Sequence, residues 1–511
     1  MEPVQEYIDR RRMFFIIVSL FAVSACAMSY EYFLGAMASY LLGDGTVQWA
    51  LTITAMMVAM GLGGFGSRFV VHHEKTVLTN EVLIAVVGGF SAFTQYAVNV
   101  YLGPNQVITL AYIFANGFIL GFQVPLFMHI SRKNGRSFGQ TVAEVTLFDF
   151  LGAVPAVALY IYLLKSVGLV RGSMFVGLVN LATVALGLVL FRRELSRRYH
   201  RCLQAVTLAV LALLLLGLGF GDRLALGLEA RLYRDQVIHV EQTAFQRLVL
   251  TRRGQDLRLY LDGNLQFSSV DEFRYHESLV HPAMGLVPAR EKVLILGGGD
   301  GLAAREVFKY PDVGRVTLVD IDPAVVALAR TYPLIASLNR GSLEDPRLQV
   351  VNMDAYKFLE QDAGRYDIII VDLPDPNNES LAKLYTVEFY RLIKNHLTAA
   401  GAMAVQATSP YFAPQVFWTV GETMEAAGLE VLPYHAYVPS FGDWGFVLGA
   451  QYRPSPEKLR LAVPTRYLTL DLLPRLFAFS ADELAGREGA EVNSIVHPVI
   501  LDLYQKAWEN W

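Results

Sequence analysis

Seven apolar stretches of about 20 residues each follow one another in the first 221 residues of the chain. A helix needs about 20 apolar residues to cross the hydrocarbon core of a membrane. Backbone polar groups find no water there, so each stretch is predicted to be an α-helix that satisfies its own hydrogen bonds. The predicted spans cover residues 13–34, 47–70, 82–101, 107–130, 142–164, 172–191 and 202–220. Residues 1–221 are therefore expected to form a multi-pass membrane domain.

The distribution of charge divides the chain at the same position. Residues 1–221 contain 15 Lys/Arg and 10 Asp/Glu, whereas residues 222–511 contain 28 Lys/Arg and 37 Asp/Glu. The charged share is thus about 11% in the first part and about 22% in the second, against about 25% in average globular proteins. This contrast excludes a single soluble domain, a disordered chain and a basic nucleic-acid binder. Two cysteines, Cys26 and Cys202, exclude a disulfide scaffold and a thiolate metal cluster.

Basic residues beside the predicted spans indicate how the first part is oriented. Thirteen lie on one side and only Lys165 and Arg171 lie on the other. The positive-inside rule then places the N-terminus in the cytoplasm, and seven spans would put the second part outside the cell. A stretch that re-enters on the same side would return the second part to the cytoplasm. The thirteen are Arg10, Arg11, Arg12, Arg68, Lys75, Arg132, Lys133, Arg136, Arg192, Arg193, Arg197, Arg198 and Arg201.

Three carboxylates, Glu31, Glu144 and Asp149, fall within or near the ends of predicted spans. A carboxylate inside a membrane is costly and suggests a function, such as binding a cationic ligand. A position at the membrane interface, or hydrogen bonds from neighbouring Tyr, Ser and Thr, would explain it equally well. The sequence leaves both interpretations open.

The second part of the chain shows the short alternating runs and turn signals of a mixed α/β fold. Strands are predicted at 245–251, 257–261 and 265–267, with Asp262-Gly263-Asn264 as a hairpin turn. The expected segments are an interfacial linker (222–238), a small β subdomain (239–288), a Rossmann-like α/β domain of the methyltransferase type (289–455) and a C-terminal helical tail (456–511).

Carboxylates follow three consecutive predicted strands of the α/β domain. A strand at 292–296 runs into the turn Gly297-Gly298-Gly299-Asp300-Gly301, whose glycines allow a ligand to approach the backbone. The second strand ends at Asp320, where a carboxylate can accept hydrogen bonds from a ribose diol. The third leads to Asp354 and Ala355, in a position to meet an adenine edge. This pattern predicts a nucleoside-binding rim.

Two further carboxylates, Asp372 and Asp375, follow a fourth predicted strand at 366–371. They lie on a proline-stiffened loop at the carboxyl edge of the sheet, which is where open α/β sheets bind ligands. The same string also favours a turn with an Asx cap. The residues alone do not decide between a catalytic pair and a turn.

Together these residues resemble the spermidine synthase (polyamine aminopropyltransferase) family over about residues 240–480. The seven-span part resembles the membrane-fused bacterial branch of that family. The matching strings are Phe245-Gln246, Leu261-Asp262-Gly263, Asp271-Glu272-Phe273-Arg274-Tyr275-His276-Glu277, the glycine turn, Asp372-x-x-Asp375-Pro376, Leu384-Tyr385-x-x-Glu388-Phe389-Tyr390, Arg466-Tyr467-x-Thr469 and Ala478-Phe479.

The resemblance implies a membrane-bound transferase that moves an aminopropyl group from decarboxylated S-adenosylmethionine to putrescine or a related amine, without a metal. Asp372, near the aminopropyl end of the donor, would belong to the catalytic group with Tyr275 and Asp375. Asp375 would take the proton of the attacking amine, and Tyr275 and His276 would help to position that amine. The donor-binding residues would be Gln246, Gly297, Gly299, Asp300, Asp320, Asp354, Ala355 and Asp372.

Two segments depart from the family pattern on the acceptor side. The string Gln406-Ala407-Thr408-Ser409-Pro410 lacks the carboxylate that anchors the far end of a diamine. The acceptor loop, here Pro439-Ser440-Phe441-Gly442-Asp443-Trp444, lacks its usual tyrosine. Putrescine as the acceptor is therefore less well supported than a sulfonium nucleoside as the donor.

Two alternatives to aminopropyl transfer remain. The first is an S-adenosylmethionine-dependent N-methyltransferase for polyamines or membrane-associated amines, in which a nearby cation offsets repulsion between Asp300 and the donor carboxylate. The second is a transporter or sensor that binds a nucleoside or polyamine without turnover. The expected partners are a small polyamine, the lipid bilayer and a second copy of the chain in a homodimer, with no nucleic acid. The catalytic domain is expected in the cytoplasm, where sulfonium nucleosides occur.

Overall fold

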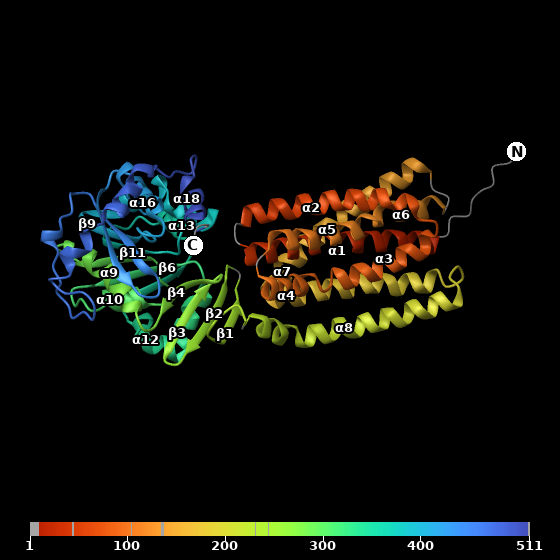
Figure 1. The fold of residues 1–511 in the computed structure, drawn as a ribbon, viewed down its shortest axis with the longest axis horizontal. Helices are drawn as coiled ribbons and strands as arrows, with labels where there is room; N and C mark the ends of the chain where they lie inside the picture. The colour runs from red at the N-terminus through yellow and green to blue at the C-terminus, as the bar shows by residue number, and fades with distance from the viewer. Residues whose placement is uncertain are drawn as a thin grey trace. The chain divides into compact units, whose positions relative to one another are not determined.

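The computed structural model describes residues 10–42, 45–103, 105–133, 137–229, 231–243 and 245–508. The chain forms two compact units, unit 1 (Met1–Arg234) and unit 2 (Asp235–Trp511), both drawn in Figure 1. Each unit has a hydrophobic core of its own. The boundary between the units lies within the segment 222–238 that the sequence predicts to be a linker.

Unit 1 is a bundle of helices, as its seven apolar stretches predict. Among the described residues, six helical segments are long and apolar enough to cross a membrane, and counting one bent pair of helices as a single span gives seven. α7 contains two of the candidate spans, joined at Gly168 in a non-helical conformation. The helices are α1 (Arg10–Leu42), α2 (Gly45–Gly66), α3 (His73–Val87), α4 (Ser91–Leu102), α5 (Gln106–Gly121), α6 (Gln123–Lys133), α7 (Phe138–Leu190) and α8 (Arg197–Glu229).

The third predicted span is the bent pair, since α3 and α4 meet at 47° across Gly88 and Gly89. Near the start of α3, the Lys75 carbonyl accepts a hydrogen bond from Tyr199 in the first turn of α8. The end of α4 leads into α5, where Gln106 is hydrogen-bonded to Gln48 at the start of α2. The pair therefore extends from the end of the bundle where α8 begins to the end where α2 begins.

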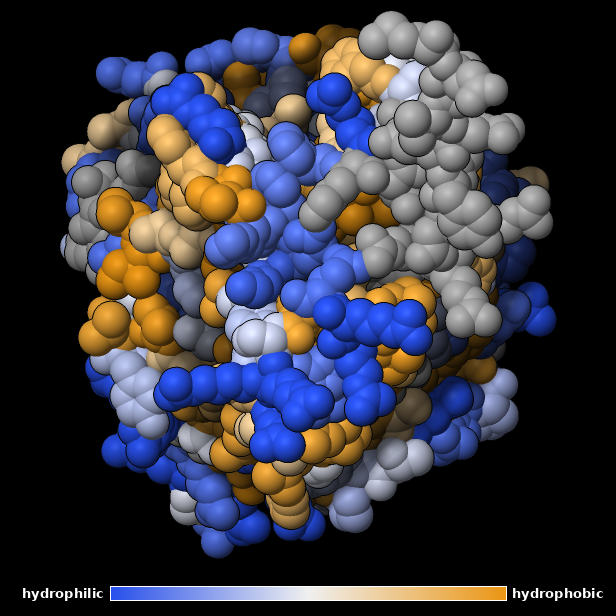
Figure 2. Space-filling view, turned by 90° about the vertical axis from the view of Figure 1, so that its right-hand side faces the viewer, coloured by the Kyte–Doolittle hydropathy of each residue, from blue (hydrophilic) through white to orange (hydrophobic). Residues whose placement is uncertain are grey.

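The described members of the thirteen basic residues lie at one end of the bundle, where α1, α3 and α8 begin (Figure 1). Figure 2 looks onto this end and shows hydrophilic side chains across its middle with hydrophobic ones around them. Arg136, one of the thirteen basic residues, lies outside the described residues. The exposed arginines are Arg68, Arg132, Arg192, Arg193, Arg197, Arg198 and Arg201.

Unit 2 begins with a four-stranded antiparallel sheet in the order β1-β2-β3-β4. The predicted hairpin turn is confirmed, because Asp262 and Gly263 both have positive φ, 48° and 82°, between β3 and β4. The expected linker is shorter than 222–238, since α8 continues to Glu229 and β1 begins at Gln236. The strands are β1 (Gln236–Gln242), β2 (Arg247–Arg253), β3 (Asp256–Leu261) and β4 (Asn264–Ser268).

The rest of unit 2 is built on a seven-stranded sheet in the order β10-β11-β9-β8-β5-β6-β7. β11 is antiparallel to both β9 and β10, and the other pairs are parallel. This confirms the predicted α/β domain of the methyltransferase type. The strands are β5 (Lys292–Gly297), β6 (Arg315–Asp320), β7 (Leu348–Asn352), β8 (Tyr366–Asp372), β9 (Leu397–Gln406), β10 (Glu430–Val438) and β11 (Gly442–Ala450).

Helices cover both faces of this sheet, so its strands are buried on both sides. Successive residues of β5 alternate between two cores, with Val293 and Ile295 in one and Leu294 and Leu296 in the other. Because the strand order reverses between β5 and β8, a crevice for ligands is expected at their carboxyl ends. The main helices are α9 (Glu272–Leu286), α10 (Leu302–Val307), α11 (Pro323–Thr331), α12 (Pro333–Leu338), α13 (Ala355–Gln361), α14 (Glu379–Ala382), α15 (Val387–His396) and α16 (Pro414–Ala426).

The tail at 456–511 is mostly irregular where the sequence predicts helix. Its helical parts are α17 (Ala481–Ala485), α18 (Val499–Trp508) and short 3₁₀ turns. Prolines interrupt it, and its backbone is bound by side chains of the preceding domain. The buried carboxylate of Glu277 accepts hydrogen bonds from the N–H groups of Arg466, Tyr467 and Leu468 at 2.6, 2.8 and 3.0 Å.

Candidate active site

The glycine turn after β5 forms the floor of the crevice. Gly297, Gly298 and Gly301 have φ of 84°, 67° and 79°, values at which only glycine is free of strain. Gly297 pairs with Asp372 at the end of β8, and a Cβ at Gly297 would collide with the carbonyl oxygen of Asp372. The turn therefore requires glycine, and it brings the ends of β5 and β8 into direct contact.

Asp320, at the end of β6, is tied to this turn. Its two carboxylate oxygens accept hydrogen bonds from the N–H groups of Gly299 and Asp322, each at 2.9 Å. Desolvation raises the pKa of Asp320 to about 6. Gln246, in the connection between β1 and β2, donates to Asp322 at 3.2 Å, and the Thr243 hydroxyl donates to the same carboxylate at 2.7 Å. Gln246 and Asp320 thus each contact Asp322, which is absent from the predicted site residues.

Asp354, after β7, caps helix α13 by accepting from the Lys357 N–H at 3.1 Å. It also accepts from the Lys383 ammonium at 2.7 Å. Desolvation opposes this charge pairing, but the pairing prevails and lowers the pKa of Asp354. Ala355, the first residue of α13, is buried. Asp354 therefore has a cationic partner of its own, which the sequence pattern does not reveal.

Asp372 and Tyr275 make the central contact of the site. The hydroxyl of Tyr275, from helix α9, donates to Oδ1 of Asp372 at 2.8 Å. Desolvation raises the pKa of Asp372, against the opposing charge of His276. Desolvation and the Asp372 charge together raise the pKa of Tyr275 well above 10. Tyr275 therefore keeps its proton at neutral pH and acts as a hydrogen-bond donor.

Asp375, three residues further on, presents one carboxylate oxygen without a partner. Oδ2 accepts from the hydroxyl of Thr408 at 3.1 Å, whereas Oδ1 is buried and has no hydrogen bond among the described residues. Desolvation raises the pKa of Asp375 to about 6, partly offset by Gln406, Thr408 and Tyr504. A carboxylate with a free oxygen and such a pKa can accept a proton near neutral pH.

His276 is turned toward a buried ion pair that the sequence reasoning missed. Its Nδ1 lies 2.9 Å from the Glu272 carboxylate, which also binds the Arg305 guanidinium through two bonds of 2.8 and 2.9 Å. Desolvation lowers the pKa of His276, but Glu272 outweighs it and raises the pKa to about 9. The spacing of Glu272 and His276, four residues apart on a predicted helix, is a signal that could have found the pair.

Asp300 completes the acidic group at the glycine turn. It accepts from the Leu302 N–H at 2.9 Å, and desolvation raises its pKa to about 6, with the His276 charge opposing this shift. His276 also interacts with Asp372. The imidazolium of His276 is thus a counter-charge for both Asp300 and Asp372.

Aromatic rings lie next to Tyr275. Phe441 lies with its ring centre 5.8 Å from that of Tyr275 and 4.9 Å from that of Trp444. The Gln406 amide donates to the Tyr385 hydroxyl at 2.6 Å and to the Leu373 carbonyl at 2.8 Å. Aromatic faces attract ammonium groups, so these rings could hold a cationic group beside Tyr275.

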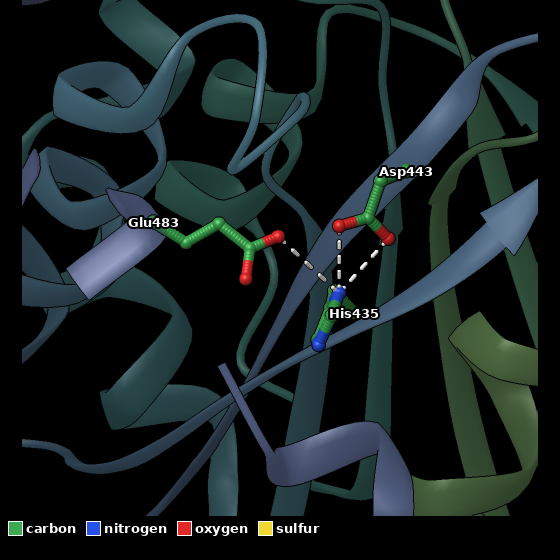
Figure 3. Close-up of side chains that lie close together, drawn as sticks. All are labelled: His435, Asp443 and Glu483. Carbon is green, nitrogen blue, oxygen red and sulfur yellow. Dashed lines mark hydrogen bonds and ion pairs between the residues drawn. The ribbon is translucent and has the colours of Figure 1, made fainter. Parts of the chain in front are cut away.

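A second cluster of titratable side chains, His435, Asp443 and Glu483, lies on β10, β11 and α17 (Figure 3). His435 Nδ1 lies 2.9 and 2.7 Å from the two oxygens of Asp443 and 4.0 Å from Glu483. Its Nε2 donates to the Ala478 carbonyl at 2.7 Å. Because protein acceptors occupy both ring nitrogens, the cluster is an ion pair that fastens the tail to the β10–β11 hairpin.

Comparisons with known proteins agree with this geometry. The model of the spermine/spermidine synthase domain matches residues 272–455. A polyamine aminopropyltransferase of Oceanobacillus iheyensis is 42% identical over 496 residues, which are 96% of each chain. Polyamine aminopropyltransferase 1 of Streptomyces coelicolor is 38% identical over 525 residues, covering all of this chain and 97% of its own.

A solved structure of spermidine synthase in complex with the transition state analogue AdoDATO is 26% identical, with a TM-score of 0.46. It covers 49% of this chain and 88% of its own. The two curated relatives, by contrast, align along nearly the whole chain and so include both units.

Proposed function

The chain belongs to the polyamine aminopropyltransferase (spermine/spermidine synthase) family and is a transferase, and from this premise we propose that it moves an aminopropyl group from decarboxylated S-adenosylmethionine to putrescine or a related amine. The observation that carries the proposal is the hydrogen bond from Tyr275 to Asp372. It lies at the crevice between β5 and β8, with Asp375 beside it.

We propose that the donor lies along the carboxyl ends of β5, β6 and β7. Asp320 would accept the ribose hydroxyls, because a carboxylate has about four acceptor positions and two are taken by N–H groups. Asp354 and Ala355 would meet the adenine, and Gln246 would help to close the site over the ribose. Asp300 and Asp372 would face the sulfonium and the ammonium of the donor. Gly297 and Gly299 would let the nucleoside approach the backbone.

The proposed chemistry is an in-line displacement at the carbon beside the sulfonium. The amine nitrogen forms a bond to this carbon, the carbon–sulfur bond breaks, and methylthioadenosine leaves. Alkylamines are mostly protonated at neutral pH, so the site must take up a proton. The free oxygen of Asp375 is placed to accept it, while Tyr275 and His276 orient the groups around the amine. Holding both reactants in line contributes much of the rate.

The second candidate is methyl transfer from S-adenosylmethionine, which differs from the decarboxylated donor by a carboxylate on the tail. The imidazolium of His276 is the observation that favours it, since it could offset repulsion of that carboxylate. Asp300 and Asp372 lie beside the same imidazolium and Glu272 already binds it, so negative charge predominates. We therefore retain decarboxylated S-adenosylmethionine as the donor.

Product analysis separates the candidate functions. We expect purified protein, given decarboxylated S-adenosylmethionine and a panel of diamines, to release methylthioadenosine and an amine heavier by one aminopropyl unit, as seen by mass spectrometry. S-adenosylhomocysteine and an amine heavier by one methylene unit would support methyl transfer instead. Tight donor binding without turnover for any amine would favour the transporter or sensor and contradict the proposal.

The pKa of Asp375 sets an expected pH dependence. A proton acceptor must be ionised, so kcat/KM should fall as the pH is lowered through about 6, the value to which desolvation raises this pKa. Asp300 and Asp320 have pKa values of about 6 as well, so the fall should be steeper than for one proton. The measurement is a rate profile between pH 5 and 9. A flat profile from pH 5 to 8 would contradict Asp375 as the acceptor.

We further propose that unit 1 crosses the cell membrane and that unit 2 faces the cytoplasm, where its donor is made. The helices of unit 1 and their broken third span support seven crossings, which places the basic end outside and opposes the positive-inside rule. The need for the donor outweighs this rule. A transferase that cannot reach its donor has no turnover, whereas the positive-inside rule is a statistical bias.

This placement predicts that the protein stays with membranes through an alkaline wash and leaves them only with detergent. A membrane-impermeant thiol reagent applied to intact cells should leave a cysteine introduced at exposed Asp312 of unit 2 unlabelled. Labelling in intact cells would place unit 2 outside.

We also propose that the protein forms a homodimer. Light scattering of the detergent-solubilised protein, which gives its mass, tests this.

A further inference from the structure

Glu81 of helix α3 is a carboxylate in the interior of unit 1 that the sequence reasoning did not single out. Its side chain is 1% exposed. The Thr183 hydroxyl of α7 donates to Oε2 at 3.1 Å, and the Asn180 amide donates to the Glu81 carbonyl at 2.6 Å. No Lys, Arg or His of the described part of the chain pairs with Glu81. A buried carboxylate without a counter-charge is strongly disfavoured in its ionised form.

Several unsatisfied polar atoms surround this carboxylate. Among the described residues, no hydrogen-bond partner is found for Oε1 of Glu81, Oδ1 of Asn180, both polar atoms of the Gln123 side chain or the Tyr30 hydroxyl. Gln123 and Asn180 lie beside the Glu81 side chain, and Tyr30 is close enough to interact with its charge. All four residues are at most 3% exposed. Buried polar groups are nearly always paired, so these four oxygen atoms and the amide nitrogen of Gln123 lack the usual partners within the described part of the chain.

The break between α3 and α4 lies next to the same group. Tyr30 packs its ring against Gly88, where a Cβ would collide with it. The carbonyls around the break are held by side chains, with Tyr112 donating to Val87 and Ser173 to Gly89, both at 3.0 Å. Glycine-interrupted helices with polar surroundings mark ion and substrate sites in membrane proteins. This feature of the backbone is independent of the unsatisfied side chains.

We propose that Glu81, Asn180, Gln123 and Tyr30 form a site for a monovalent cation inside unit 1. One carboxylate balances one positive charge, which selects against divalent ions. Acceptor oxygens from three more side chains suit the three N–H donors of a protonated primary amine or the coordination of an alkali ion. The face of the Tyr30 ring also attracts cations. The inference concerns unit 1 alone and holds whether or not unit 2 transfers aminopropyl groups.

The test is direct binding to the full-length protein in detergent. Methylammonium, sodium and potassium chlorides are titrated separately by calorimetry in a choline chloride buffer of constant ionic strength. Because methylammonium could also enter the acceptor site of unit 2, the same titrations are run on D375N. We expect one cation to bind to wild type and to D375N, and to raise the thermal unfolding temperature of both. E81Q, which removes the charge at nearly constant shape, should abolish this binding.

The test includes one control variant, E31Q, and a second variant of the proposed site, Q123A. E31Q removes a partly exposed carboxylate of α1 and should bind as wild type. Q123A keeps the charge of Glu81 and should weaken binding about 10-fold, so a failure of E81Q to fold leaves a second measurement. Binding of methylammonium alone identifies an amine site, and binding of sodium or potassium identifies an alkali-ion site. No cation binding in wild type, or unchanged binding in E81Q and Q123A, would overturn the proposal.

Discussion

Replacement of Asp375 by asparagine is expected to lower kcat for aminopropyl transfer by about 10²–10⁴-fold, the usual contribution of a general base. Asparagine keeps the shape of the side chain but cannot take the amine proton. The Thr408 hydroxyl, which donates to Oδ2 of Asp375 at 3.1 Å, can still donate to the amide oxygen, so the loop should keep its conformation. The measurement is steady-state kinetics with decarboxylated S-adenosylmethionine and the best amine of the panel.

Two further measurements separate this role from a structural one. The dissociation constant of the donor should change by no more than a few-fold in D375N, because Asp375 lies on the acceptor side. D312N, at an exposed carboxylate that pairs with Arg290, is the matched control and should keep wild-type kcat. An active D375N enzyme would remove Asp375 as the base. A large loss of donor affinity would assign it to donor binding instead.

Replacement of Glu272 by alanine is expected to destabilise unit 2 by about 3–5 kcal/mol, the cost of leaving a buried charge without its partner. Glu272 binds both Arg305 and His276, and all three side chains are less than one tenth exposed. The free energy of unfolding is followed by urea denaturation of the full-length protein in detergent. Tryptophan fluorescence serves as the signal, since unit 2 contains four of the five tryptophans.

The E422A variant provides the control for this measurement. Glu422 pairs with Arg487, but their side chains are 33% and 56% exposed, so its loss should cost no more than about 1 kcal/mol.

The free energy of unfolding, measured over a series of pH values, gives a second test of the Glu272–His276 pair. The folded pKa of His276 is about 9 against an ordinary value of 6.5, so its stabilisation is complete below about 6.5 and is lost as the pH rises through about 9. E272A should flatten this loss. Equal stability of E272A and wild type would refute the role of the pair.

The parts of the site that follow strands could be predicted from the sequence. Gly297, Asp320 and Asp372 lie at the carboxyl ends of parallel strands, and hydrophobic runs mark such strands clearly. The strands predicted at 292–296 and 366–371 agree with β5 and β8 to within about a residue at either end. The hairpin turn at Asp262 could also be predicted, because the residue types that favour such a turn lie next to one another in the sequence.

Features that depend on long-range contacts could not be predicted. Arg305 reaches Glu272 across 33 residues, and no local pattern links them. The sequence gives no sign of a partner for Asp354, whereas in the folded chain the Lys383 ammonium donates a hydrogen bond to it. Glu81 directly precedes the predicted span 82–101, and its burial depends on the packing of α3 against α7. The irregular tail escaped prediction because Glu277 and its neighbours hold its backbone.

Helix α18 bears on how the burial of Asp375 is maintained. Tyr504 of this helix lies against Asp375, although the two residues are far apart in the sequence. The water-poor surroundings that raise the pKa of Asp375 therefore depend on the docking of α18 against the α/β domain. Loosening of this helix would let water reach the carboxylate without any change in the loop that carries it.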